Sequence, residues 1–137
     1  MDCQINASTS EYLSRFYEPK VTAYEFLKCF FAYLKKERID QINRDLVSFL
    51  YKQKQNNSND DVLEEIKFRN NGVKHYSDDV EDALFNLQNG GLLGKMNPSF
   101  GIIIINYTDS EITETLNSIP SKYRAIISNI ATEYINN

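Results

Sequence analysis

The clearest structural pattern in the chain lies in residues 76–107, YSDDVEDALFNLQNGGLLGKMNPSFGIIIINY. Ser77 is a favourable helix cap, and four carboxylates crowd the turn after it, where the helix dipole favours negative charge. An apolar stripe of Val80, Leu84 and Leu87 follows at helical spacing. Asn89-Gly90-Gly91 then supplies a glycine end signal. The segment predicts a helix that begins after Ser77 and ends near Asn89.

A β-hairpin is predicted directly after this helix. Residues 92–96 form a short apolar run, 97–99 (Asn-Pro-Ser) read as a turn, and 102–107 are rich in isoleucine. Two apolar runs joined by turn residues, with β-branched side chains in the second run, are typical of paired strands.

Helical patterns account for most of the remaining chain. Thr22 and Glu25 have the spacing of a capping box, and a short helix from Asp60 is expected to end at Asn70-Asn71-Gly72. The predicted helices are 23–36, 39–54, one from Asp60, 109–118 capped by Asp109, and one from Ser121.

The expected fold class is therefore mainly α with one β-hairpin. We expect one domain over 1–137, with a frayed tail at 1–8, a core at 23–107 and C-terminal helices at 109–137. The length allows a single hydrophobic core.

Composition excludes several protein classes. No run approaches the roughly 18–20 apolar residues of a membrane span, and the first residues lack the pattern of a secretion signal. Cys3 and Cys29 are far apart, which favours a reducing cytoplasm. Asparagine and isoleucine are plentiful and alanine is scarce. That bias is common where codons are AT-rich, so we expect a bacterial or phage source.

Charge is unevenly distributed around the net value of −4. Residues 1–56 hold nine Lys/Arg against seven Asp/Glu, whereas 57–91 hold three against eight. An acidic middle argues against a protein whose whole surface seeks a phosphate backbone.

The order of helices, acidic helix and hairpin resembles the winged-helix superfamily over about residues 23–107. The resemblance is carried by Val80-Glu81-Asp82-Ala83-Leu84 and Leu87-Gln88-Asn89-Gly90-Gly91-Leu92-Leu93. It implies a third helix that ends in a Gly-Leu-Leu step before a wing hairpin. Most members of this superfamily read DNA by placing that helix in the major groove, with a basic wing on the backbone.

This chain departs from the pattern where DNA would be read. Residues 77–91 contain four carboxylates and no Lys or Arg, and the wing offers Lys95 alone. Placing such a helix against phosphates would bring like charges together. The first hypothesis is therefore a non-enzymatic protein-interaction module, a dimeric component of a bacterial or phage-related assembly. Its expected partner has a basic surface and contacts Asp78, Asp79, Glu81 and Asp82.

The alternative is a DNA-binding regulator or antitoxin-like protein that uses the basic front of the chain. The residues that would contact nucleic acid or another anion are Lys35, Lys36, Arg38, Arg44, Lys52 and Lys54. Lysine and arginine are also the default residues of a solvated helix face, and that interpretation is favoured here.

Catalytic and metal chemistry find little support, so we expect no enzyme, no cofactor and no metal. His75 is the one histidine, which excludes a multi-histidine site. The acidic pairs are explained by helix first turns. The closely spaced glycines follow a helix and precede a strand, the reverse of a phosphate-binding loop.

The aromatic helix at 23–34 is apolar on nearly every side, which predicts burial of more than one face. We expect a single chain to cover neither this helix nor the apolar stripe of 123–135 completely. Exposed stripes of this size would favour a homodimer through the terminal helices.

Overall fold

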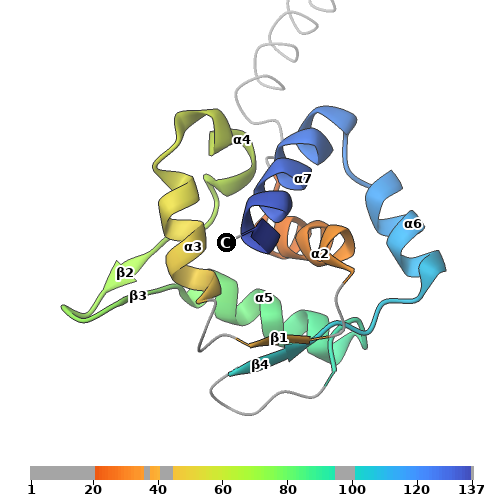
Figure 1. The fold of residues 1–137 in the computed structure, drawn as a ribbon, viewed down its shortest axis with the longest axis horizontal. Coiled ribbons are helices and arrows are strands. Elements are labelled where there is room, and N and C mark those ends of the chain that lie inside the picture. Colours follow the sequence, from red (N-terminus) through yellow and green to blue (C-terminus); the bar gives the residue numbers. More distant parts are fainter. Residues whose placement is uncertain (1–20, 36–37, 41–44, 95–100, 137) are drawn as a thin grey trace, which may run out of the picture.

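The computed structural model describes residues 21–35, 38–40, 45–94 and 101–136. The predicted tail at 1–8, the turn at 97–99, and Lys36, Arg44 and Lys95 lie outside the described residues. The part that is described is mainly helical, with two small antiparallel sheets (Figure 1).

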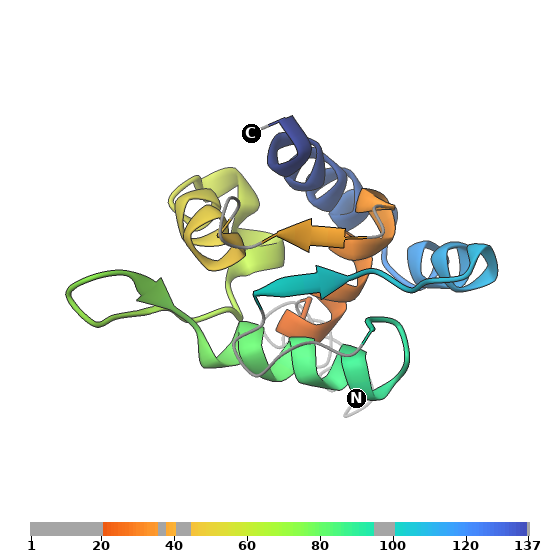
Figure 2. The ribbon, with the colours of Figure 1, turned by 60° about the horizontal axis from the view of Figure 1, so that its bottom comes forward.

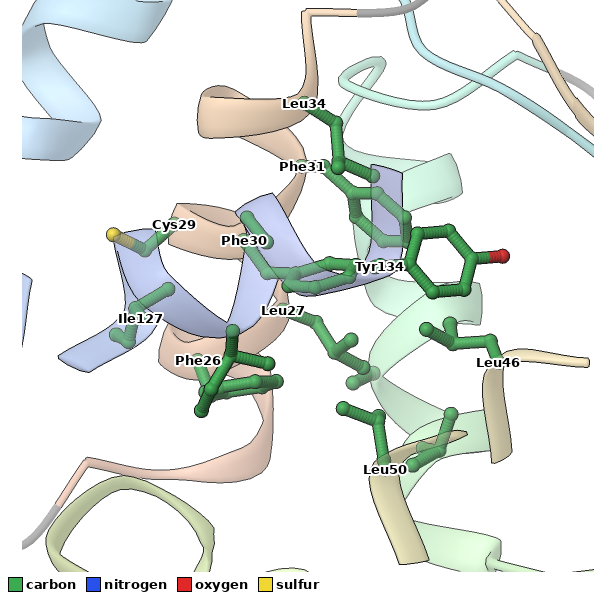
Figure 3. Packing of buried hydrophobic residues seen from close by; sticks show 14 of the residues in the cluster. Phe26, Leu27, Cys29, Phe30, Phe31, Leu34, Leu46, Leu50, Ile127 and Tyr134 are labelled. Carbon is green, nitrogen blue, oxygen red and sulfur yellow. The ribbon is translucent and has the colours of Figure 1, made fainter. Parts of the chain in front are cut away.

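Helix α2 (Ala23–Leu34) lies at the centre of the core. Thr22 and Glu25 form the predicted capping box, and Lys35 ends the helix in the left-handed region at φ 53°. The Phe30 ring, 0% exposed, contacts Phe26 and Tyr134, and Figure 3 shows it between α2 and the C-terminal helix. Burial on more than one face is confirmed; the buried residues are Phe26, Leu27, Cys29, Phe30, Phe31, Ala32 and Leu34.

Helix α7 (Ser121–Asn136) covers α2 from one side. Of the stripe expected to stay partly exposed, Tyr123, Ile127, Ile130 and Tyr134 are buried within one chain, whereas Ile126 and Ile135 are half-buried. Intrachain packing therefore covers most of both stripes, and most of the exposure on which the expectation of a homodimer rested is absent. Among the described residues, no helix combines the length and apolar character needed to cross a bilayer.

The larger sheet joins distant parts of the sequence. Strand β1 (Arg38–Asp40) pairs antiparallel with β4 (Ile102–Ile104), and Ile39 lies opposite Ile103. On the other edge of β4, Leu93 bridges Ile105, and the Gly94 N–H donates to the Ile104 carbonyl. Within the described residues, the two apolar runs therefore meet only at this single bridge, and residues 92–94, the described part of the predicted strand at 92–96, form no strand. The strand partner of β4 is β1, which was not expected.

The predicted helix at 39–54 is wrong in its first part. Helix α3 (Leu46–Lys54) begins after Asp45, whose carboxylate accepts hydrogen bonds from the N–H groups of Val47 and Ser48. Ile39 instead belongs to β1, where cross-strand pairing with Ile103 buries both side chains.

A second hairpin replaces the expected end of the third helix. After a 3-10 turn, η1 (Asn57–Asn59), helix α4 (Asp60–Leu63) is only one turn long. Strands β2 (Arg69–Asn70) and β3 (His75–Tyr76) then pair across a turn in which Gly72 has φ +90°. Asn70-Asn71-Gly72 therefore forms a hairpin turn, so its prediction as a helix end is wrong. We call residues 67–76 the arm; it projects from the body in both views (Figures 1 and 2).

Helix α5 (Asp78–Asn89) matches its prediction. Ser77 caps it by accepting from the Val80 N–H, and Gly91 follows its end at φ +83°. It packs on α2 through Val80, Ala83, Leu84 and Leu87. Helix α6 (Asp109–Asn117) is also present, but its cap is Thr108, which forms a capping box with Glu111, and not Asp109.

Candidate interaction surfaces

The outer face of α5 combines negative charge with an aromatic ring. Glu81 and Asp82 are exposed. Phe85, which is four residues after Glu81 and three after Asp82, is 44% exposed. Residues at this spacing are neighbours on a helix surface. Within the described residues, Glu81 and Asp82 have no ion-pair partner. We define the outer face of α5 by Glu81, Asp82 and Phe85.

The other two predicted partner-binding carboxylates hold the arm. Asp78 forms an ion pair of 2.5 Å with Arg69, whose guanidinium also lies over the Tyr76 ring. The hydrogen bond and charge of Asp78 raise the pKa of Arg69 above its usual value. Asp79 accepts a hydrogen bond of 2.8 Å from the Lys67 N–H. The structure thus separates the four carboxylates into two that contact the arm and two that face outward.

The root of the arm is held by hydrogen bonds to the backbone N–H and the backbone carbonyl of Lys67. Its N–H donates to Asp79, and its carbonyl accepts from the Ser77 hydroxyl at 2.7 Å. Ser77 is only 3% exposed. On the other strand of the arm, the His75 ring stacks on Tyr51 of α3, with centroids 3.6 Å apart and planes 15° apart. These contacts anchor the base of the arm to both α5 and α3.

The arm is a basic element inside the acidic middle of the sequence. Lys67, Arg69 and Lys74 are exposed, and residues 66–77 contain no Asp or Glu. These are the only three cations in 57–91. The net charge of 57–91 is negative, so it does not show this basic segment. The local signal for the segment is the presence of three cations within the eight residues 67–74.

The proposed basic contact residues lie in two separate places. Lys35 and Arg38 are exposed between the end of α2 and the start of β1. Lys52 and Lys54 lie in the last turn of α3, and Figure 1 shows that turn at a different end of the molecule from β1. The Lys54 ammonium also donates to the Ile66 carbonyl. The four described cations therefore do not form one patch.

Titratable groups in the core are held in their neutral forms. Burial raises the pKa of the Cys29 thiol to about 12, although the nearby Arg124 acts in the opposite direction. Burial also raises the pKa of Tyr107, whose hydroxyl donates to the Lys28 carbonyl at 2.6 Å. A buried thiol with a raised pKa is a poor nucleophile. In the described ranges, no three His, Cys, Asp or Glu side chains gather as metal ligands would.

Comparisons with protein-family models, with curated proteins and with solved structures each found no match. The function must therefore be argued from the two charged surfaces, the outer face of α5 and the arm.

Proposed function

We propose that this chain is a non-enzymatic interaction module on a winged-helix-like scaffold, and that the outer face of α5 binds a basic protein surface. The observation that carries the proposal is the composition of that face. It presents Glu81 and Asp82 beside a partly exposed aromatic ring, with no cation in residues 77–91.

The order of elements supports the scaffold. Helix α5 ends at Gly90-Gly91, and the chain then enters the pairing of Leu93 with Ile105. This is the helix-then-hairpin order on which the winged-helix resemblance rests. In such a scaffold α5 occupies the position of the third helix.

The charges on α5 favour a protein partner over DNA. Groove binding gains affinity from releasing counterions as cations meet phosphates, and α5 has no cation to contribute. Lysine or arginine from a protein can instead pair with Glu81 and Asp82. The exposed part of the Phe85 ring adds apolar area beside such a pair.

Charge reversal on α5 with a matched control tests the proposal. The tagged chain and Glu81→Lys/Asp82→Lys are used to capture partners from the source cells. The control, Asp61→Lys/Glu65→Lys, makes the same change in net charge at exposed carboxylates in and after α4. Circular dichroism verifies that all three proteins are folded.

The proposal expects a nuclease-resistant protein partner that is lost with the α5 variant and kept with the control. Capture of the same partner by all three proteins would contradict a role for the outer face of α5.

The alternative, a DNA-binding regulator, is favoured by one observation: Lys35 and Arg38 are both exposed near the start of β1. A gel shift that weakens steeply with salt and disappears in Lys35→Glu/Arg38→Glu supports it. No binding at low salt excludes it.

A further inference from the structure

The arm has the features of a docking element. Its strands project beyond the body in Figure 2, and Val73 near its tip is 90% exposed. Lys67 precedes β2 and Lys74 precedes β3, and both lysines are exposed. A projecting two-stranded ribbon gains little stability from its own contacts. An exposed aliphatic side chain among cations therefore points to a partner surface that is both apolar and acidic.

The outer face of α5 has the complementary chemistry. Glu81 and Asp82 complement the lysines of the arm, and Phe85 supplies apolar area for Val73. The sizes also agree. The arm folds back on itself over ten residues, with two paired residues on each side (Arg69–Asn70 and His75–Tyr76), so it reaches at most roughly 16 Å. The twelve residues of α5 span roughly 18 Å.

The arm cannot reach the outer face of α5 in its own chain. Its root is fixed by the hydrogen bonds of Lys67 to Ser77 and Asp79. From this junction the arm and α5 extend in opposite directions, as both ribbon views show (Figures 1 and 2). Contact between these two surfaces therefore requires a second molecule.

We propose that two copies of the chain exchange their arms, so that each arm lies along the outer face of the other copy's α5. Because arm and helix diverge from one junction, a twofold axis near that junction forms both contacts at once. This inference rests on the proposed function, since it names the basic partner of α5 as the arm of a second copy.

A second copy fits the arm better than a nucleic acid does. Asp78 and Asp79 lie at the root of the arm, and Glu81 and Asp82 lie directly after them at the start of α5. A duplex lying on the arm would bring its phosphates towards these carboxylates. The arm of a second copy brings lysines, not phosphates, to Glu81 and Asp82.

The test is a charge exchange between two variants, measured by analytical ultracentrifugation at low salt. The arm variant is Lys67→Glu/Lys74→Glu, and the helix variant is Glu81→Lys/Asp82→Lys. We expect the unmodified chain to dimerise and each variant alone to dissociate with a constant about tenfold or more higher, because several exposed pairs become repulsive. An equimolar mixture should recover dimers, since each arm then meets a helix of opposite charge.

Several outcomes overturn the inference. They are a monomeric unmodified chain at all concentrations reached, a mixture of folded variants that stays monomeric, and a helix variant that still dimerises. DNA binding by a monomeric chain that is lost in the arm variant also overturns it and assigns the arm to nucleic acid. If the chain is monomeric but the helix variant alone loses a heterologous partner, the inference fails and the proposed function stands.

Discussion

Replacing Ser77 with alanine should cost more than the loss of a helix cap. The hydroxyl accepts from the Val80 N–H and donates to the Lys67 carbonyl, so one oxygen caps α5 and fixes the arm. Loss of a cap typically costs about 1 kcal/mol. Leaving a partly buried carbonyl without its donor adds about 1–2 kcal/mol. We therefore expect Ser77→Ala to lower the free energy of unfolding by about 2–3 kcal/mol.

Thr108→Ala is the matched control. Thr108 caps α6 in an exposed capping box, and within the described residues its hydroxyl makes no hydrogen bond to a second element. Its loss should cost about 1 kcal/mol. Urea-induced unfolding followed by circular dichroism measures both values, and hydrogen exchange at the Lys67 amide reports whether the arm root has loosened. Equal costs for the two variants, with unchanged exchange at Lys67, would refute the dual role of Ser77.

Three further predictions concern the core. Phe30→Ala should lower the free energy of unfolding by about 3–5 kcal/mol, whereas Phe85→Ala at a partly exposed site should cost less than about 1 kcal/mol; similar urea midpoints for the two would contradict the packing described for Phe30. The raised pKa of Cys29, about 12 against 9.0 for a free thiol, means that unfolding releases its proton above about pH 9. The stability that this group contributes is fully present below that pH and is lost as pH rises towards 12, by about 1.4 kcal/mol per pH unit. Cys29→Ala should therefore reduce the decrease in the free energy of unfolding between about pH 9 and pH 10. An equal decrease in the variant and the unmodified chain would contradict the raised pKa of Cys29. Tyr107→Phe removes the hydroxyl that donates to Lys28 and should cost about 1 kcal/mol in thermal or urea unfolding, so an unchanged stability would mean that this hydrogen bond contributes nothing.

Local signals in the sequence predicted the helices that have strong ends. Thr22 with Glu25 marks the start of α2, and Ser77 with Gly90-Gly91 marks both ends of α5; α2 ends at Leu34, two residues before its predicted end at Lys36. Such signals act over three or four residues, so they are visible without tertiary structure. The aromatic surplus of α2 likewise predicted that more than one of its faces is buried.

Strand β1 could not be found from local pattern. Ile39 and Leu46 happen to fit a helical period, but Ile39 is buried by Ile103, a residue far away in the sequence. A three-residue strand is defined by its partner rather than by its own composition. Asp45, whose side chain caps α3, is the local signal that could have moved the helix start.

The arm was missed for two reasons. Asn70-Asn71-Gly72 suits a helix end and a hairpin turn equally well, because both need a residue with positive φ. The charge of Lys67, Arg69 and Lys74 was averaged with the acidic helices on either side. The sequence therefore indicated the acidic start of α5 but not the arm, whose Arg69 and Lys67 contact Asp78 and Asp79.

The pairing of β1 with β4 sets an order of events during synthesis. Ile39 leaves the ribosome well before Ile103, its cover in the finished sheet. At elongation rates of about 5–20 residues per second the interval is roughly 3 to 13 seconds. Throughout that time the edge of β1 that pairs with β4, and the side of α2 that α7 covers, are open to other nascent chains or to chaperones. A chain truncated before β4 leaves the edge of β1 without its partner. Such a fragment should aggregate more readily than the complete chain, because an unpaired strand edge can pair with other chains.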